Sequence, residues 1–407
     1  MNRGTPVVPD VVSDIQRSAP IQRPEWNDDA QLPWVLANLG ARQPLVSAEQ
    51  VDTLRSLLAR VAAGEAQVVQ AGDCCEDPRE CSAEQVRRKL AVLDLLAGTV
   101  KLGTNKPVLR VGRIAGQFAK PRSKPLELIG DLVLPVFRGH MVNDPMPDAW
   151  WRRPDPRRIL ACYKVAKPVM EQLGWLEPRT GPARAHFEAP VWTSHEALLL
   201  EYELPMIRQR GDGRRWLGST HWPWVGYRTS QLHGAHVTLL AEITNPVACK
   251  VGPTMSPGAL LDLCARLDPH RQPGRLTLIA RMGAATVADR LPGLVEVVHS
   301  AGHPVIWLCD PMHGNTVTTG DGYKTRLLED IIREVHDFKR AVADGNGVAG
   351  GIHLETTPHD VTECVADASE IGSVGDRYTS LCDPRLTPRQ AVTVASAWAR
   401  ATSGEEL

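Results

Sequence analysis

The chain has 407 residues, of which 43% are hydrophobic and 23% are charged, and its formal net charge is −1. This balance excludes a generally basic nucleic-acid binder and fits a globular protein of two or three domains, or one α/β barrel with insertions. No apolar run approaches the roughly 20 residues of a membrane span, and residues 1–16 lack the apolar segment of a signal peptide. Nine scattered cysteines indicate free or metal-bound thiols in a reducing compartment. We therefore expect a cytoplasmic protein that binds neither nucleic acid nor a membrane.

The chain begins with a stretch unlike the rest. Residues 1–45 are rich in proline and polar residues, and residues 51–63 carry apolar side chains at helical spacing up to Gly64. We predict an N-terminal arm and helix over residues 1–64, followed by one catalytic domain over residues 65–407.

After this arm, short β-prone runs alternate with longer helical stretches, which is typical of a parallel sheet with crossover helices. Eight strands are predicted, at 66–71, 107–111, 190–193, 216–220, 247–251, 276–280, 304–308 and 350–354. Helices are predicted between them, at 83–96, 155–173, 257–267, 285–300 and 326–344. Eight such units predict an α/β fold of the (β/α)8 TIM barrel type, with an insertion after the second strand. The alternative is an open doubly wound sheet, which is disfavoured because no Gly-x-Gly-x-x-Gly follows the first strand.

A barrel of this type carries its functional residues just after the carboxyl ends of its strands. Cys74, His313 and Glu355 follow or end strands one, seven and eight, and Asp383 lies in the loop beyond strand eight. A thiolate, an imidazole and two carboxylates together suit a divalent transition metal with room for substrate. The alternative is that each of these side chains merely fills a core or loop.

Basic residues also follow the predicted strands, namely Arg113, Lys120, Arg122, Arg228, Lys250 and Arg281. Lys250 and Arg281 adjoin apolar strands, where a cation needs an anionic partner. Several cations meeting at one barrel mouth imply a small ligand with more than two negative charges, such as a sugar phosphate or phosphoenolpyruvate. The alternative for any one of them is an ordinary solvated face.

The motifs at these strand ends resemble those of type II 3-deoxy-D-arabino-heptulosonate 7-phosphate (DAHP) synthases over residues 25–400. They stand at 70–74, 112–123, 193–198, 250–253, 281–283, 310–316, 351–355 and 382–386. Three further segments resemble the short form of the phenazine pathway, at 219–224, 245–250 and 353–358.

The resemblance implies a transferase that condenses phosphoenolpyruvate with erythrose 4-phosphate at a divalent metal, with Mn²⁺ preferred and Co²⁺, Fe²⁺ or Zn²⁺ possible. It implies metal ligands at Cys74, His313, Glu355 and Asp383, and phosphoenolpyruvate contacts at Arg113, Lys250 and Arg281. It places the aldose phosphate at Lys120, Arg122, Ser123, Trp224, Tyr227 and Arg228, with Lys120, Lys250 and His313 as the catalytic groups. It also implies a homodimer and a place in a shikimate-type pathway of secondary metabolism.

Four residues depart from the family pattern near the expected substrate mouth: His140, Tyr227, Ser230 and His233. One interpretation is drift that keeps the ordinary activity. A second is an aminoDAHP synthase that uses an amino or imino aldose phosphate. A third is a catalytically impaired paralogue that acts as a protein-binding subunit. The arm is short compared with that of the feedback-regulated family members, so we expect little inhibition by aromatic amino acids.

Overall fold

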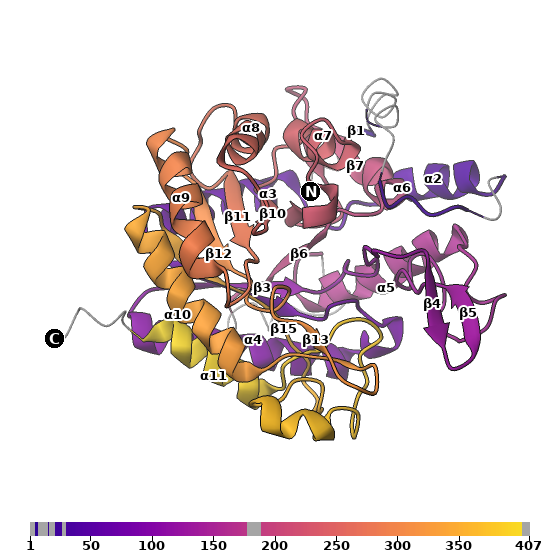
Figure 1. The fold of residues 1–407 in the computed structure, drawn as a ribbon. Coiled ribbons are helices and arrows are strands. Elements are labelled where there is room, and N and C mark those ends of the chain that lie inside the picture. The colour runs from indigo at the N-terminus through magenta and orange to yellow at the C-terminus, as the bar shows by residue number, and fades with distance from the viewer. Residues whose placement is uncertain (1–4, 7–14, 16–20, 27–29, 177–188, 401–407) are drawn as a thin grey trace. The chain divides into compact units, whose positions relative to one another are not determined.

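The computed structural model of the chain describes residues 5–6, 15, 21–26, 30–176 and 189–400. Within these residues eight strands form a closed barrel in the order β10-β11-β12-β15-β2-β3-β6-β9 (Figure 1). Their bounds are Gln67–Gly72 (β2), Val108–Arg113 (β3), Trp192–Glu196 (β6), Trp222–Val225 (β9), Val247–Val251 (β10), Leu276–Ala280 (β11), Ile306–Cys309 (β12) and Ala349–Glu355 (β15). The predicted (β/α)8 barrel is therefore confirmed.

Helices follow the strands, as the alternating pattern predicts. They are Leu32–Gly40 (α2), Ala48–Ala62 (α3), Ala83–Thr104 (α4), Arg157–Gln172 (α5), Leu200–Glu203 (α6), Ala235–Glu242 (α7), Pro257–Leu267 (α8), Val287–Ser300 (α9), Leu328–Asp344 (α10) and Pro388–Ala399 (α11). Local signals set some of the boundaries: α8 starts where the Ser256 side chain accepts a hydrogen bond from the Ala259 amide. At α11, Thr387 and Gln390 form a capping box.

The chain forms two compact units, each made of several chain segments. The second unit comprises residues 54–74, 87–113 and 246–407. It contains six parallel strands in the order β10-β11-β12-β15-β2-β3. Their pairing runs from Val247↔Leu276 to Gly72↔Arg113, with one register shift between Trp307 and Leu308 in the β12–β15 pair. β10, β11, β12 and β2 are buried along their whole length, which explains why most of their residues are apolar. Helices α9, α10 and α11 pack in sequence within this unit.

The first unit comprises residues 1–53, 75–86 and 114–245. It contains the parallel pair β6 and β9, and an antiparallel sheet of Thr5–Pro6 (β1), Ile207–Gln209 (β7) and Arg215–Leu217 (β8). The prediction that 216–220 is the fourth barrel strand is wrong. The chain turns at Gly218, whose amide bonds to the Met206 carbonyl, so β8 pairs with β7, and the barrel strand is β9.

The predicted insertion after the second barrel strand is present in the first unit. It holds a β-hairpin of Leu126–Ile129 (β4) and Leu132–Pro135 (β5), followed by α5. A smaller hairpin in the second unit consists of Val317–Thr318 (β13) and Lys324–Thr325 (β14). The helix predicted at 51–63 is α3, but much of the arm lies outside the described residues, so the division at residue 64 stays a prediction. Among the described helices, none is both long and apolar enough to cross a membrane.

Candidate active site

Three of the predicted metal ligands meet in the second unit. One ligand atom each from His313, Glu355 and Asp383 lies within 4.8 Å of the others. Glu355 ends β15 and is fully buried, and its Oε1 lies 3.1 Å from His313 Nε2. The other ring nitrogen of His313 lies 2.9 Å from Asp310 Oδ1. A carboxylate on the far nitrogen fixes the orientation of a metal-binding imidazole, so the Asp310–His313 pair fits a metal site.

Cys74, the fourth predicted ligand, lies beside this group. The Asp383 amide donates to Cys74 Sγ at 3.4 Å, and Ser380 Oγ lies 3.5 Å from the same sulfur. Cys74 follows Gly72, which has a φ of +149° and whose missing Cβ would come within 2.9 Å of the Arg113 carbonyl oxygen. Glycine at this position therefore lets β2 and β3 approach closely just before the cysteine. Together the four side chains offer the mixed soft and hard donors that divalent transition metals bind.

A buried carboxylate holds the loop that carries Asp383. Glu363 Oε1 accepts hydrogen bonds from the Ser380 amide at 2.8 Å, from both the amide and the hydroxyl of Thr379, and from Arg385 Nη2. Its Oε2 accepts from the Arg385 amide and Nε. Arg385 Nη1 reaches Asp73 at 3.0 Å, and Lys89 pairs with the other oxygen of Asp73 at 2.6 Å. Residues 379–385, with Asp383 among them, are thus fastened to the segment that contains Cys74.

Cations balance the two ligand carboxylates. Lys324, from β14, lies 2.8 Å from Asp383 Oδ1, and Arg326 lies 2.9 Å from Glu355 Oε2. Arg326 is fully buried, which alone would lower its pKa, but Glu355 and Asp383 raise the pKa above its usual value. Two carboxylates close together repel each other, so positive charge is needed among them. Lys324 and Arg326 supply such charge to Asp383 and Glu355 within the described structure.

The three cations assigned to phosphoenolpyruvate surround the same cluster. Arg113 Nη2 lies 3.2 Å from Glu355 Oε1, Lys250 Nζ lies 2.8 Å from Asp310 Oδ2, and Arg281 Nη2 donates to the His313 carbonyl at 2.7 Å. Arg113 and Lys250 are almost fully buried. The structure thus brings together the second-unit cations that the sequence predicted, around His313.

Lys250 and Asp310 shift each other's pKa. Burial lowers the pKa of Lys250, and Asp310 partly offsets this. Burial would raise the pKa of Asp310, but His313 and Lys250 bring it well below its usual value. Asp310 therefore stays ionised while it holds both the lysine and the histidine.

The residues assigned to the aldose phosphate lie in the first unit. Arg228, just after β9, donates from Nη2 and Nε to Ser123 Oγ at 2.7 and 3.1 Å. Arg122 Nη2 donates to Glu127 Oε2 at 3.1 Å. Lys120 is buried and its amide bonds to the Arg138 carbonyl. Arg228 is exposed and Tyr227 half-buried beside it, whereas Trp224 is buried within β9.

The loop that leads to Lys120 is shaped by one buried carboxylate. Glu76 accepts hydrogen bonds from the consecutive amides of Ala115, Gly116 and Gln117 at 2.7–2.9 Å. A Cβ on Gly116 would come 2.0 Å from His195 Nδ1, so only glycine fits there. His195 is itself held by Glu203, which also accepts from Ser219.

The four departures from the family pattern occupy different surroundings. His140 is buried, and its Nε2 lies 3.8 Å from Asp77 Oδ1, so an acid still stands beside this position. Burial lowers the pKa of His140, although Asp77 and Asp144 oppose the shift. The Ser230 hydroxyl donates to the carbonyl of Tyr227 in its own turn.

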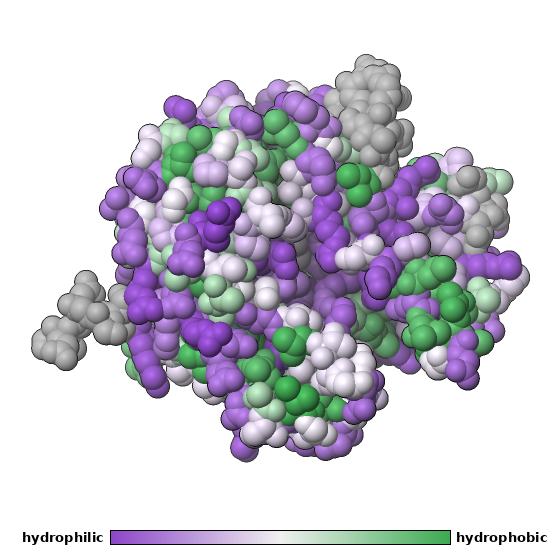
Figure 2. Space-filling model, in the orientation of Figure 1, coloured by the Kyte–Doolittle hydropathy of each residue, from purple (hydrophilic) through white to green (hydrophobic). Residues whose placement is uncertain are grey.

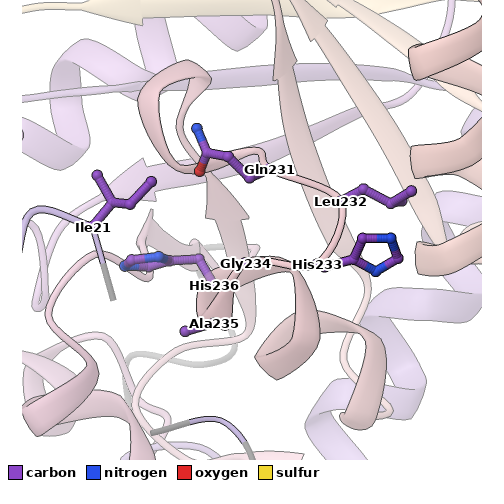
Figure 3. A pocket seen from close by; sticks show the side chains of 7 residues that line it. All are labelled: Ile21, Gln231, Leu232, His233, Gly234, Ala235 and His236. Carbon is purple, nitrogen blue, oxygen red and sulfur yellow. The ribbon is translucent and has the colours of Figure 1, made fainter. Parts of the chain in front are cut away.

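His233 lines a hollow of about 350 Å³ with Ile21, Gln231, Leu232, Gly234, Ala235 and His236. Figure 3 shows its ring directed away from Ile21 and His236. His236 is buried and bonds to the Leu198 carbonyl at 2.8 Å.

Several residues of the cluster have no role in the sequence prediction. Asp310 could have been found from the local sequence, because it directly follows a buried strand and stands three residues before His313. No local sequence pattern points to the other three, Lys324, Arg326 and Glu363, because their partners lie up to 59 residues away in the chain.

Comparisons with known proteins show which proteins this chain resembles. A model of the Class-II DAHP synthetase family matches residues 11–186 and 180–399. A probable phospho-2-dehydro-3-deoxyheptonate aldolase of Pseudomonas fluorescens is 55% identical over 389 residues, covering 96% of this chain and 97% of that protein. The phospho-2-dehydro-3-deoxyheptonate aldolase AroG of Mycolicibacterium smegmatis is 36% identical, covering 92% of this chain and 91% of its own length. The corresponding aldolase of Streptomyces coelicolor is 37% identical, with 92% and 93% covered.

Proposed function

The chain belongs to the class-II DAHP synthetase family and is a DAHP synthase, and we propose that it works at a divalent metal held by Cys74, His313, Glu355 and Asp383. It condenses phosphoenolpyruvate with erythrose 4-phosphate and releases inorganic phosphate. The observation that carries the metal proposal is the meeting of His313, Glu355 and Asp383 within 4.8 Å, with three cations around them.

The reaction joins C3 of phosphoenolpyruvate to the aldehyde carbon of the aldose phosphate. The aldehyde oxygen takes up a proton, water adds at C2 of the enol phosphate, and the phosphate leaves. The bound metal would polarise the aldehyde as a Lewis acid. The protein has to hold two highly charged substrates and deliver that proton.

Arg113, Lys250 and Arg281 bind the phosphate and carboxylate of phosphoenolpyruvate. Arginine offers a planar fork that matches either group, and lysine offers a compact charge. Asp310 keeps Lys250 Nζ and the His313 ring in place before substrate arrives. Groups that are already oriented need no rearrangement as charge shifts during the reaction.

Arg228, Ser123 and Arg122 bind the phosphate of the aldose. The Arg228–Ser123 contact supports this assignment because it already gathers an exposed guanidinium and a hydroxyl at one point. Tyr227 lies next to Arg228 and Trp224 in the strand before it, which makes both part of this region. Lys120 donates the proton to the aldehyde oxygen, a role that suits an ammonium shielded from water.

Mn²⁺ is the metal we propose, with Co²⁺, Fe²⁺ and Zn²⁺ as chemically allowed substitutes. The two carboxylates favour a hard ion, whereas the thiolate and imidazole favour a softer one. We place the reaction in the cytoplasm, because both substrates are phosphorylated metabolites and the nine cysteines, all in the described part of the chain, remain thiols rather than disulfides.

A specialised shikimate-type pathway, such as the phenazine route, is the metabolic setting we propose. It rests on the resemblance of residues 219–224, 245–250 and 353–358 to the phenazine-pathway form. Such a setting predicts little inhibition by Phe, Tyr or Trp in a steady-state assay at saturating metal. Strong synergistic inhibition by these amino acids would contradict it.

Phosphate release is the experiment that tests the proposed reaction. The purified chain is given phosphoenolpyruvate, Mn²⁺ and either erythrose 4-phosphate or its amino analogue. We expect release with erythrose 4-phosphate. Release with the amino analogue alone would identify an aminoDAHP synthase, and release with neither would favour an impaired paralogue that acts as a binding subunit.

A further inference from the structure

Helix α10 carries one charged side chain on its buried side. Its exposed face bears Glu329, Arg333 and Arg340, and Figure 2 shows mainly hydrophilic surface over this helix. The buried residues of α10 are apolar except for Glu334, which is 1% exposed. Burial raises the pKa of Glu334 to about 8, because the charged form loses its hydration. A buried carboxyl group costs stability that an apolar side chain would not, so packing alone does not account for Glu334.

Glu334 joins the two loops that follow strands β11 and β12. Its Oε1 accepts hydrogen bonds from the consecutive amides of Met282 and Gly283, at 3.0 and 2.8 Å. Its Oε2 accepts from Asn315 Nδ2 at 2.6 Å. These three N–H donors partly offset the rise in the pKa of Glu334. Because all three are donors, they match a carboxylate, whose two oxygens only accept.

The Asn315 amide is fixed by its other contacts. Its Nδ2 also donates to the Pro311 carbonyl at 2.8 Å, and its Oδ1 accepts from the Ala284 amide at 2.9 Å. Turning the amide over would set oxygen against oxygen at Pro311 and donor against donor at Ala284. Asn315 therefore presents a donor to Glu334, and it ties the loop after β12 to the loop after β11 a second time.

The backbones of the two loops also lie in direct contact. A Cβ on Gly314 would come 2.3 Å from the nitrogen of Gly283, so no side chain fits between the loops. Arg281 Nη2 donates to the His313 carbonyl at 2.7 Å, which is a further link between them. We call these residues the Glu334 clamp: 281–284, 311–315 and Glu334.

The Glu334 clamp contains Arg281, assigned above to phosphoenolpyruvate, and His313, assigned to the metal. Groups that are oriented before the substrate arrives need no rearrangement as charge shifts during the reaction. We propose that Glu334 is a positioning residue that keeps Arg281 and His313 in place relative to each other, a role that rests on the proposed function. Glu334 acts through the loop amides and Asn315, and it is not itself a ligand of substrate or metal.

Glu334→Gln tests this role because it leaves only one accepting oxygen. Whichever way the new amide turns, its NH2 group meets donors, either the Met282 and Gly283 amides or Asn315 Nδ2. Loss of a group that orients a metal ligand typically weakens metal binding by roughly 10- to 100-fold. We expect the affinities for phosphoenolpyruvate and for Mn²⁺ each to fall about tenfold or more, because the clamp positions a residue of each site.

An exchange of the acid and the amide should restore the clamp. In the double variant Glu334→Gln with Asn315→Asp, the glutamine oxygen accepts from the two loop amides, and its NH2 group donates to the new carboxylate. Recovery should be partial, because the carboxylate still accepts from the Ala284 amide but cannot donate to the Pro311 carbonyl. Asn315→Asp alone sets two carboxylates against each other and should weaken both affinities. A double variant that binds no better than Glu334→Gln would refute the role of this pair.

Both affinities are measured on the full-length protein without turnover, so a failed condensation reaction would leave this test intact. Phosphoenolpyruvate is followed by calorimetry and Mn²⁺ by competition with a fluorescent chelator, at about pH 8.5, where Glu334 is largely ionised. Val342→Ala is the control, because Val342 is fully buried more than two turns further along α10 and outside the Glu334 clamp. It should lower the melting temperature and leave both affinities unchanged. Unaltered affinities in Glu334→Gln, or equal losses in Val342→Ala, would overturn the proposal.

Discussion

Glu363 offers a test of how the protein positions two of the proposed metal ligands, because it contacts the loop of Asp383 and is not itself one of those ligands. It is fully buried and accepts six hydrogen bonds from the loop that carries Asp383. Glu363→Gln keeps the size of the side chain but leaves one oxygen and one amide group. The amide cannot accept a hydrogen bond, so the donors on one side of the carboxylate lose their partner.

The size of the effect follows from these contacts. Breaking a buried ion pair costs about 3–5 kcal/mol, but Arg385 would keep Asp73 as a second partner. Replacing groups that orient metal ligands typically weakens metal binding by roughly 10- to 100-fold. We expect Glu363→Gln to weaken Mn²⁺ binding within this range, because Asp383 and the Ser380–Cys74 contact move with the loop.

Mn²⁺ affinity is measured by competition with a fluorescent chelator, so the assay does not depend on turnover. Leu263→Ala is the control, since Leu263 is buried in α8 and its truncation should cost about 2–5 kcal/mol of stability. This control should lower the melting temperature while leaving Mn²⁺ affinity unchanged. Equal affinity in Glu363→Gln and the unaltered protein, or an equal loss in Leu263→Ala, would refute the positioning role.

Two further predictions concern residues of the first unit, Arg228 and His221. Arg228→Ala should raise the KM for erythrose 4-phosphate about tenfold or more, as expected for the loss of a charged hydrogen bond of about 1.5–3 kcal/mol. The exposed Arg214→Ala serves as control in initial-rate assays, and an equal rise in the KM for phosphoenolpyruvate would contradict the assignment. Burial lowers the pKa of His221 to about 3 in the folded protein. In the unfolded chain the pKa of this imidazole is about 6.5, so as the pH falls the unfolded chain takes up a proton there before the folded protein does. Stability should therefore fall by about 2 kcal/mol between pH 7.5 and 5, and urea titrations of His221→Asn should lose that part of the pH dependence. If the free energy of unfolding of His221→Asn depended on pH as it does in the unaltered protein, this role of His221 would be wrong.

Much of the barrel is predictable because its buried parallel strands are short, mostly apolar runs. Strands such as β10 and β11 were predicted at their exact bounds for this reason. The fourth barrel strand was misplaced because two short β-prone runs, at β8 and β9, are separated by only four residues. The Pro223 within β9 reads locally as a break, and only the pairing of β8 with β7 decides between the two runs.

The candidate site likewise has residues that could be predicted from the sequence and contacts that could not. Cys74, Arg113, Lys250, Arg281 and Glu355 could be found because strand ends fix their positions along the chain. The supporting contacts could not, because they join distant loops whose approach no local pattern encodes. Glu363 is an ordinary acidic residue in the sequence, and its importance comes from the fold of residues 379–385 around it.

Metal-dependent turnover tests the central claim most directly. The protein is stripped of metal with a chelator, and phosphate release from phosphoenolpyruvate and erythrose 4-phosphate is followed as Mn²⁺ is added. We expect activity to return with one Mn²⁺ per chain, and we expect Cys74→Ser and His313→Ala to lose both turnover and tight Mn²⁺ binding. Cys264→Ser, a buried thiol in α8, should behave like the unaltered protein. Full activity in the stripped protein, or unaltered metal binding in Cys74→Ser and His313→Ala, would contradict the claim.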